Sequence, residues 1–113
     1  MQHRNRITLE KMISETDIGL KILGDKSPEE FISDEILKRA LSMTVINIGE
    51  PAKVVTDDLR SANKEFPWKA VAGMRDITAH RYQTLRMEDV YMTVHDEISC
   101  FKKQLELILK TDD

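Results

Sequence analysis

The sequence predicts an all-α fold, an antiparallel four-helix bundle with one short additional helix. Only three of the 113 residues are proline and four are glycine, so long segments contain no helix breaker. Apolar residues recur at alternating steps of three and four, which is the spacing of one helix face, and no segment shows strand-type alternation. An apolar fraction of 41% and a charged fraction of 33% suit a folded globular protein. We expect residues 1–113 to form one domain.

The first helix is expected over residues 4–24. Gly24 is a suitable stop because glycine readily ends helices. Ser27, Pro28 and Glu30 then form the pattern of a capping box with proline at the first helical position, which predicts a short helical turn. The apolar face of the first helix comprises Leu9, Ile13, Thr16, Leu20 and Leu23.

A second long helix is expected to begin after Asp34, which can cap it. Pro51 lies within this helix and removes one backbone donor, so we expect a kink near Asn47. Residues 57–66 are polar and predict a short helix plus a connection. One side of the second helix carries Leu37, Leu41, Thr44, Ile48, Ala52 and Val55.

Pro67 marks the opening of a third helix, which is expected from about Trp68 to His80. Trp68 is expected to anchor the bundle rather than to stack on bases, since a tryptophan buries a large apolar area. Gly73 lies in the interior of this helix, where glycine costs about 1 kcal/mol relative to alanine. We expect Gly73 to permit the close approach of a neighbouring helix.

The last helix has the clearest pattern. Its spacing alternates four and three over more than twenty residues, and Glu88 and Asp89 suit the positive end of its dipole. Such a stripe is more often bundle core than a surface for a partner. The stripe comprises Met87, Tyr91, Val94, Ile98, Phe101, Leu105 and Ile108.

Charge is unevenly distributed along the chain. The net charge of the chain is −3. Residues 60–86 contain six basic and two acidic residues, a net charge of +4, so the rest of the chain has a net charge of −7. A basic segment of this kind can face a phosphate backbone, although a solvated helix face is the alternative. The single cysteine, Cys100, cannot form an intramolecular disulfide, which favours a reducing compartment. With no secretory h-region and no apolar run of about 20 residues, we expect a cytoplasmic protein without membrane contact.

The segment GMRDITAHRYQTL, residues 73–85, contains the residues best suited to chemistry. Arg75, His80 and Tyr82 occur together in a chain with only three histidines and two tyrosines. Histidine can act as base or acid near neutral pH, and arginine offers a planar fork of donors to phosphate oxygens. On a regular helix, positions five apart point about 140° from each other. Arg75 and His80 therefore require a distorted helix, a side chain that reaches around it, or a two-fold dimer that brings two motifs together.

The stretch PWKAVAGMRDITAHRY, with NIGEPAK upstream, resembles the HepT group of the HEPN superfamily over essentially the whole chain. The signature of that group is arginine followed by a polar residue, then histidine five positions after the arginine and tyrosine two further. Arg75, Asp76, His80 and Tyr82 fill these places. Pro51 is a departure, because alanine is commoner there in the family, and it affects the second helix rather than the motif.

This resemblance implies a HEPN-like, dimeric, metal-independent endoribonuclease that is the toxin of a toxin–antitoxin pair. The antitoxin would be an MntA-like nucleotidyltransferase that adenylylates the motif tyrosine, which is Tyr82 here. Arg75 would stabilise the phosphate of an RNA substrate and His80 would transfer protons. Asp76 either supports Arg75 or is a surface carboxylate. The alternative interpretation of Tyr82 is a structural one, in which its buried hydroxyl packs at a helix end.

Further residues complete the expected site. Lys69, Arg81 and Arg86 are candidates for RNA binding because each adds positive charge near the motif. His3 and His95 show no ligand spacing with Cys100, so neither a metal site nor a cofactor is expected.

Two other functions remain open from the sequence. One is a non-catalytic helical module that binds substrate or nucleotide for a nucleotidyltransferase, in which Arg75 binds a phosphate and His80 is structural. The other is an interaction bundle whose last helix contacts a partner. The complete Arg, His and Tyr spacing favours the nuclease over both.

Overall fold

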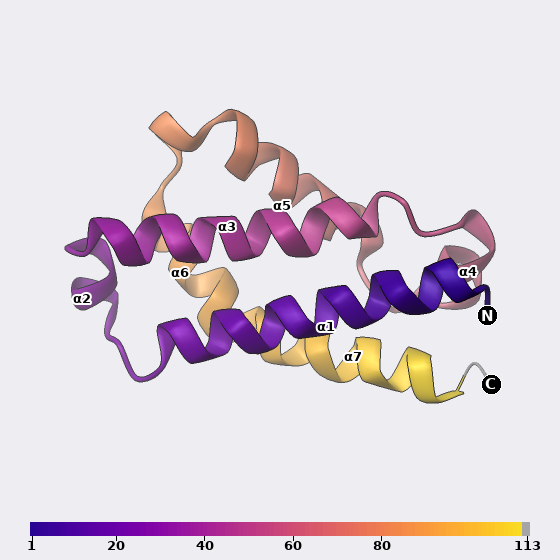
Figure 1. Cartoon of the computed structure of the whole chain (residues 1–113). Coiled ribbons are helices and arrows are strands. Elements are labelled where there is room, and N and C mark those ends of the chain that lie inside the picture. The colour runs from indigo at the N-terminus through magenta and orange to yellow at the C-terminus, as the bar shows by residue number, and fades with distance from the viewer. Residues whose placement is uncertain (112–113) are drawn as a thin grey trace.

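The computed structural model describes residues 1–111 and confirms the all-α fold, with helices and no strand in that range (Figure 1). None of the helices in this range is both long and apolar enough to cross a bilayer. In chain order the elements are α1 (His3–Leu23), α2 (Pro28–Ile32), α3 (Glu35–Ala52), α4 (Asp57–Ala62), α5 (Trp68–His80), the 3₁₀ turn η1 (Tyr82–Thr84), α6 (Met87–Met92), the π-helical turn η2 (Thr93–Glu97) and α7 (Ile98–Thr111).

The long helices pack in an antiparallel arrangement, with α1 between α3 and α7 (Figure 1). Helix α5 lies against another side of α3, and α2 and α6 close the end of the bundle opposite the two chain termini. The apolar faces predicted from the spacing meet in one core. Its fully buried side chains include Leu9, Met12, Phe31, Leu41, Ile48, Val55, Val71, Val94, Ile98 and Leu105.

The first helix boundaries follow the predicted capping residues. Helix α1 ends at Leu23, and Gly24 adopts a φ of 51°, a conformation that favours glycine. Ser27 and Glu30 form the reciprocal capping box at the start of α2, with distances of 3.1 and 3.0 Å. The Asp34 carboxylate accepts a hydrogen bond from the Leu37 amide at 3.0 Å and begins α3.

Pro51 falls in the last turn of α3 rather than at a bend in its middle. Figure 1 shows α3 as one continuous helix, and its bounds, Glu35–Ala52, include Asn47 and end one residue after the proline. Lys53 and Val54 then donate to the carbonyls of Glu50 and Pro51, at 3.2 and 3.1 Å, in tighter turns. The kink expected near Asn47 is replaced by the end of the helix. Because Pro51 lies in the last turn, little of the helix follows it that a bend could redirect.

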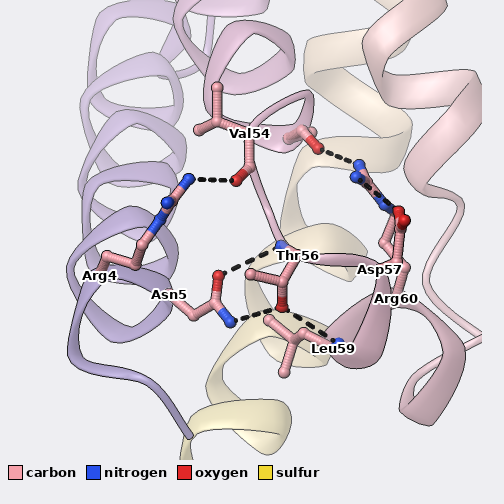
Figure 2. Close-up of polar contacts among 8 residues, drawn as sticks. Arg4, Asn5, Val54, Thr56, Asp57, Leu59 and Arg60 are labelled. Atoms are coloured by element: carbon pink, nitrogen blue, oxygen red, sulfur yellow. Dashed lines mark hydrogen bonds and ion pairs between the residues drawn. The ribbon is translucent and has the colours of Figure 1, made fainter.

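The connection between α3 and α4 is fixed by the start of α1, as Figure 2 shows. Asn5 is buried, its amide donates to the Thr56 hydroxyl at 2.9 Å, and the Thr56 amide donates back to Asn5 Oδ1 at 3.3 Å. The Thr56 hydroxyl also caps α4 by accepting from the Leu59 amide. Because Thr56 is bonded both to Asn5 and to Leu59, the segment between Ala52 and α4 has a defined position against the start of α1.

Aromatic contacts position the start of α5. The rings of Phe66 and Trp68 lie 4.5 Å apart, and Phe66 also contacts Phe101 of α7 at 5.6 Å. Trp68 is buried, and its indole N–H donates to the Asn63 carbonyl at 3.0 Å. The prediction that Trp68 anchors the bundle is therefore confirmed.

The long C-terminal helix differs from the sequence prediction in one respect. Its apolar stripe is buried as expected, from Tyr91 to Ile108, but residues Thr93–Glu97 form a π-helical turn between α6 and α7. The spacing of the apolar side chains indicates which face of the helix contacts the core. It does not indicate which carbonyl accepts the hydrogen bond of each backbone amide. The π turn was therefore not predictable from the stripe.

Candidate active site

The site begins where α5 crosses α3 at Gly49. A Cβ atom on Gly49 would lie 2.4 Å from Arg75 Cβ and 2.6 Å from the Val71 carbonyl oxygen, so only glycine permits this approach. The expectation for Gly73 is wrong within the chain, because no atom lies within 4 Å of a Cβ built there. The close approach lies on α3 instead, since α5 turns the opposite face, which carries Val71 and Arg75, toward its neighbour.

Arg75 contacts carboxylates from both helices. Its Nε lies 2.5 Å from Glu50 Oε2 on α3, and its Nη1 lies 3.2 Å from Asp76 Oδ1. The Nε atom is buried and makes no well-aligned hydrogen bond, so the contact with Glu50 is an ion pair rather than a directed bond. Within the described chain, the hydrogen bonds and ion pairs of Arg75 leave Nη2 without a partner.

His80 meets Arg75 in the same chain. Arg75 Nη1 lies 3.3 Å from His80 Nε2. His80 is the last residue of α5, and Arg81 leaves the helical conformation with φ −124° and ψ 28°. The contact is made because the flexible arginine reaches toward the helix end, so a dimer is not required for it. A guanidinium only donates, so Nε2 must be the unprotonated nitrogen of His80 in this contact.

Asp76 connects the pair to α3. Its carboxylate accepts from Lys53 Nζ at 2.9 Å and from Arg75 Nη1 at 3.2 Å. The hydrogen bond from Lys53, together with its charge, holds the pKa of Asp76 below its ordinary value, and Arg75 adds to this effect. Asp76 is thus in contact with Arg75, as a supporting residue would be.

Tyr82 lies on the 3₁₀ turn that follows α5. It is half-buried, and the Arg39 guanidinium of α3 sits 5.6 Å from the centre of its ring. No protein group among residues 1–111 forms a hydrogen bond with the Tyr82 hydroxyl. The hydroxyl is therefore not committed to packing at the helix end.

The three predicted RNA-binding residues are exposed but do not gather at one place. Lys69 lies in the first turn of α5, whereas Arg81 and Arg86 flank the 3₁₀ turn at the other end. Arg86 Nε lies 3.9 Å from Glu88, a weak surface contact.

Three residues outside the motif contribute to the site, of which Gly49 and Lys53 were not singled out from the sequence, whereas Glu50 was a candidate for lining the cleft beside Pro51. Gly49 lets α5 approach, Glu50 pairs with Arg75, and Lys53 pairs with Asp76. All three belong to the NIGEPAK segment. A polar run beside a glycine on an otherwise apolar helix was the available signal.

A hollow of about 330 Å³ adjoins Glu50 between α1 and α3. Asn47 lines it and donates to Glu15 Oε1 at 3.3 Å, so Asn47 bridges the two helices there. Among residues 1–111, no three His, Cys, Asp or Glu side chains lie close enough together to hold a metal ion.

The arrangement can act on a phosphodiester. A guanidinium held by two carboxylates presents a fixed positive charge, and beside it lies an imidazole nitrogen that acts as a hydrogen-bond acceptor. A helical bundle that carries this pair at the end of one helix, followed by a tyrosine, is a protein of the HEPN class.

Comparison with known proteins identifies the family within that class. The model of the family described as "Ribonuclease HepT-like" matches residues 12–108, and the chain belongs to this family. A protein of Caldanaerobacter subterraneus subsp. tengcongensis named "Putative RNase" is 31% identical over 104 residues, which cover 92% of this chain and 93% of that one.

Two further relatives are also named as ribonucleases. Another "Putative RNase", from Methanocaldococcus jannaschii, is 33% identical over 99 residues, which cover 88% of this chain and 85% of that one. The "Probable ribonuclease HepT" of Thermococcus cleftensis is 29% identical over 73% of this chain and 74% of that one. No solved structure matches the chain.

Proposed function

We propose that the chain is a metal-independent endoribonuclease that cleaves RNA at a phosphate bound by Arg75 and His80. The observation that carries this proposal is the contact between Arg75 Nη1 and His80 Nε2, 3.3 Å long and at an exposed helix end. The names of the relatives, which describe ribonucleases, support the same reaction class. Arg75 Nη2, which has no protein partner in residues 1–111, is the group offered to the phosphate.

The reaction follows from the chemistry of the two side chains. Once Arg75 Nη1 turns from His80 to the bound phosphate, His80 Nε2 accepts the proton of a ribose 2′-hydroxyl, and that oxygen attacks the adjacent phosphorus. The bond from phosphorus to the 5′-oxygen breaks, and the leaving oxygen takes up a proton from water, which leaves a 2′,3′-cyclic phosphate and a free 5′-hydroxyl. Protonated His80 then returns its proton to the solvent. Arg75 stabilises the charge that develops on the phosphate oxygens, so no metal ion is needed for that purpose.

The test is cleavage of total RNA in the presence of a chelator by the wild type and by His80→Ala and Arg75→Ala. We expect rates lower by about 10²–10⁴-fold for His80→Ala and about 10²–10³-fold for Arg75→Ala, with helical circular dichroism unchanged. His95→Ala is the matched control, because His95 is exposed, lies in η2 rather than in α5, and pairs with the neighbouring Asp96. Cleavage that survives both site substitutions would show that the protein is not this nuclease, and would favour the non-catalytic module.

The proposal includes regulation at Tyr82. A toxin of this family would be neutralised when an MntA-like nucleotidyltransferase transfers AMP from ATP to the Tyr82 hydroxyl. The free hydroxyl supports this, and so does Arg39, whose cation lies over the ring and can pair with the added phosphate. The negative charge and bulk of AMP would block RNA at Arg75.

Mass spectrometry tests this modification directly. Incubation with such a nucleotidyltransferase and ATP should add AMP to the wild type and to Tyr91→Phe, but not to Tyr82→Phe. Tyr91 is the second of the two tyrosines, it is buried, and its hydroxyl donates to the Lys26 carbonyl at 2.8 Å. Modification that persists in Tyr82→Phe would remove Tyr82 from the proposal.

We also propose a homodimer with the motif helices near its interface. Ile77 on α5 is 52% exposed, and Gly73, one turn before it, faces open space. An exposed isoleucine beside an uncrowded glycine provides a surface that a second helix can approach closely. Two copies joined there would place two Arg75–His80 pairs on one assembly.

A further inference from the structure

A group of four basic residues lies outside the Arg75–His80 pair, around a hollow of about 720 Å³. Four basic residues line it: Lys53 after α3, Arg60 on α4, Lys64 after α4 and Lys69 at the start of α5. No carboxylate is among the lining residues. Because the whole chain carries −3, this hollow is a basic region on an otherwise acidic molecule.

The four cations differ in how they are held. Arg60 donates to the Ala52 carbonyl and pairs with Asp57, both at 3.2 Å, so it also caps the end of α3 (Figure 2). Lys53 pairs with Asp76. Lys64 and Lys69 have no hydrogen bond or ion pair with any of the residues 1–111. The fold therefore holds two lysines beside two other cations without neutralising them, which leaves them available to an anion.

The hollow has an apolar floor. Phe66 and Trp68 line it, and their rings pack on each other at 4.5 Å. Both rings are buried in the core, so we expect this floor to be rigid. The four basic side chains line the hollow around it. Such a surface suits a flexible polyanion whose phosphates reach the rim.

The hollow is connected to the candidate active site. Lys53 reaches from its rim to Asp76, which contacts Arg75, which in turn contacts His80. Along α5, Lys69 precedes Arg75 by six residues, or about 9 Å of helix rise. A strand whose phosphate lies at Arg75 can thus extend along α5 into the hollow within a few nucleotides.

We propose that this hollow binds the phosphate backbone of single-stranded RNA next to the cleaved bond. The inference rests on the proposed nuclease function and adds to it a binding site made of Lys53, Arg60, Lys64 and Lys69. Its contacts are to phosphates, so it contributes affinity without base specificity.

The experiment compares Lys64→Ala/Lys69→Ala with the wild type, using a labelled oligouridine whose 2′-hydroxyls are methylated so that it cannot be cleaved. Anisotropy titrations at several salt concentrations should show weaker binding by the double variant. The slope of log K against log salt should fall in magnitude by about 1.4, since each phosphate contact on a single strand contributes about 0.7. Lys21→Ala/Lys103→Ala is the matched control, because both lysines are exposed on other helices and have no ion-pair partner among residues 1–111.

Trp68 supplies a second readout at the hollow itself. It is the only tryptophan of the chain and lines the floor, so its emission should change when the oligonucleotide saturates the wild type. Equal salt slopes for the two double variants, an unresponsive Trp68, or variants that weaken only the binding of a protein partner would each overturn the proposal. Because the oligonucleotide is not cleaved, these results are independent of whether His80→Ala abolishes cleavage.

Discussion

Arg75 is the residue on which the candidate site depends, because its guanidinium contacts three side chains through two of its nitrogens. Glu50 lies at Nε, while Asp76 and His80 both lie at Nη1. Only a planar fork of donors can serve these groups together. The two carboxylates fix the cation, and the imidazole is left beside it as an acceptor.

Arg75→Lys is therefore not a conservative change. A single ammonium group cannot reach Glu50, Asp76 and a substrate phosphate together, so we expect the rate of RNA cleavage to fall by about 10²–10³-fold, close to the effect of Arg75→Ala. Single-turnover cleavage of a labelled RNA measures this loss. A lysine variant within a few-fold of the wild type would mean that Arg75 acts only as a point charge.

Asp76 makes a second residue-scale prediction, on the pH dependence of stability. Its pKa is lowered in the folded state, chiefly by Lys53, so its contribution is present above the ordinary carboxyl pKa of about 3.9 and is lost as pH falls through the lower folded value. The wild type should have a higher Tm than Asp76→Asn at neutral pH, and the difference should disappear in acid. Asp25→Asn is the matched control, at an exposed carboxylate without a partner in residues 1–111. A Tm difference that stays constant into acid would contradict the assignment.

At the scale of elements, the crossing of α3 and α5 determines where Arg75 lies. Gly49→Ala should destabilise the fold by about 1–3 kcal/mol, because the new methyl group would overlap Arg75 Cβ and the Val71 carbonyl. It should also lower RNA cleavage by moving Arg75 away from Glu50. Urea denaturation measures the first effect. The sign of the change in the free energy of unfolding is informative, because replacing an uncrowded helical glycine by alanine would instead stabilise the fold by about 1 kcal/mol.

Most element boundaries were predictable, and the exceptions have a common cause. Gly24, Ser27 and Asp34 act through hydrogen bonds to residues a few positions away, so their effects are visible in the sequence. The end of α3 one residue after Pro51 leads instead into a segment held by a distant partner, through the pairing of Asn5 with Thr56. The π turn at Thr93–Glu97 likewise changes the backbone ladder without changing which side chains are buried.

At the scale of the whole molecule, the proposed homodimer makes the last prediction. Ile77→Asp should convert a dimer into a monomer and lower RNA cleavage, because a charge would be buried at the interface. Sedimentation measures the mass, and circular dichroism should show unchanged helix content. Leu107→Asp is the control, since Leu107 is 59% exposed on α7, which packs on α1 rather than α5. A wild type that is monomeric and fully active would contradict the proposal.

The sequence by itself determined the helices, their core-facing sides and the residues capable of chemistry, since these depend on local spacing and side-chain type. Arg75, Asp76, His80 and Tyr82 were identified in this way. Only the tertiary structure decided that Arg75 and His80 touch within one chain and that Glu50 and Lys53 complete the site. It also gathered Lys53, Arg60, Lys64 and Lys69 around one hollow. These juxtapositions depend on how closely α5 approaches α3, which is set by a contact between residues distant in the sequence.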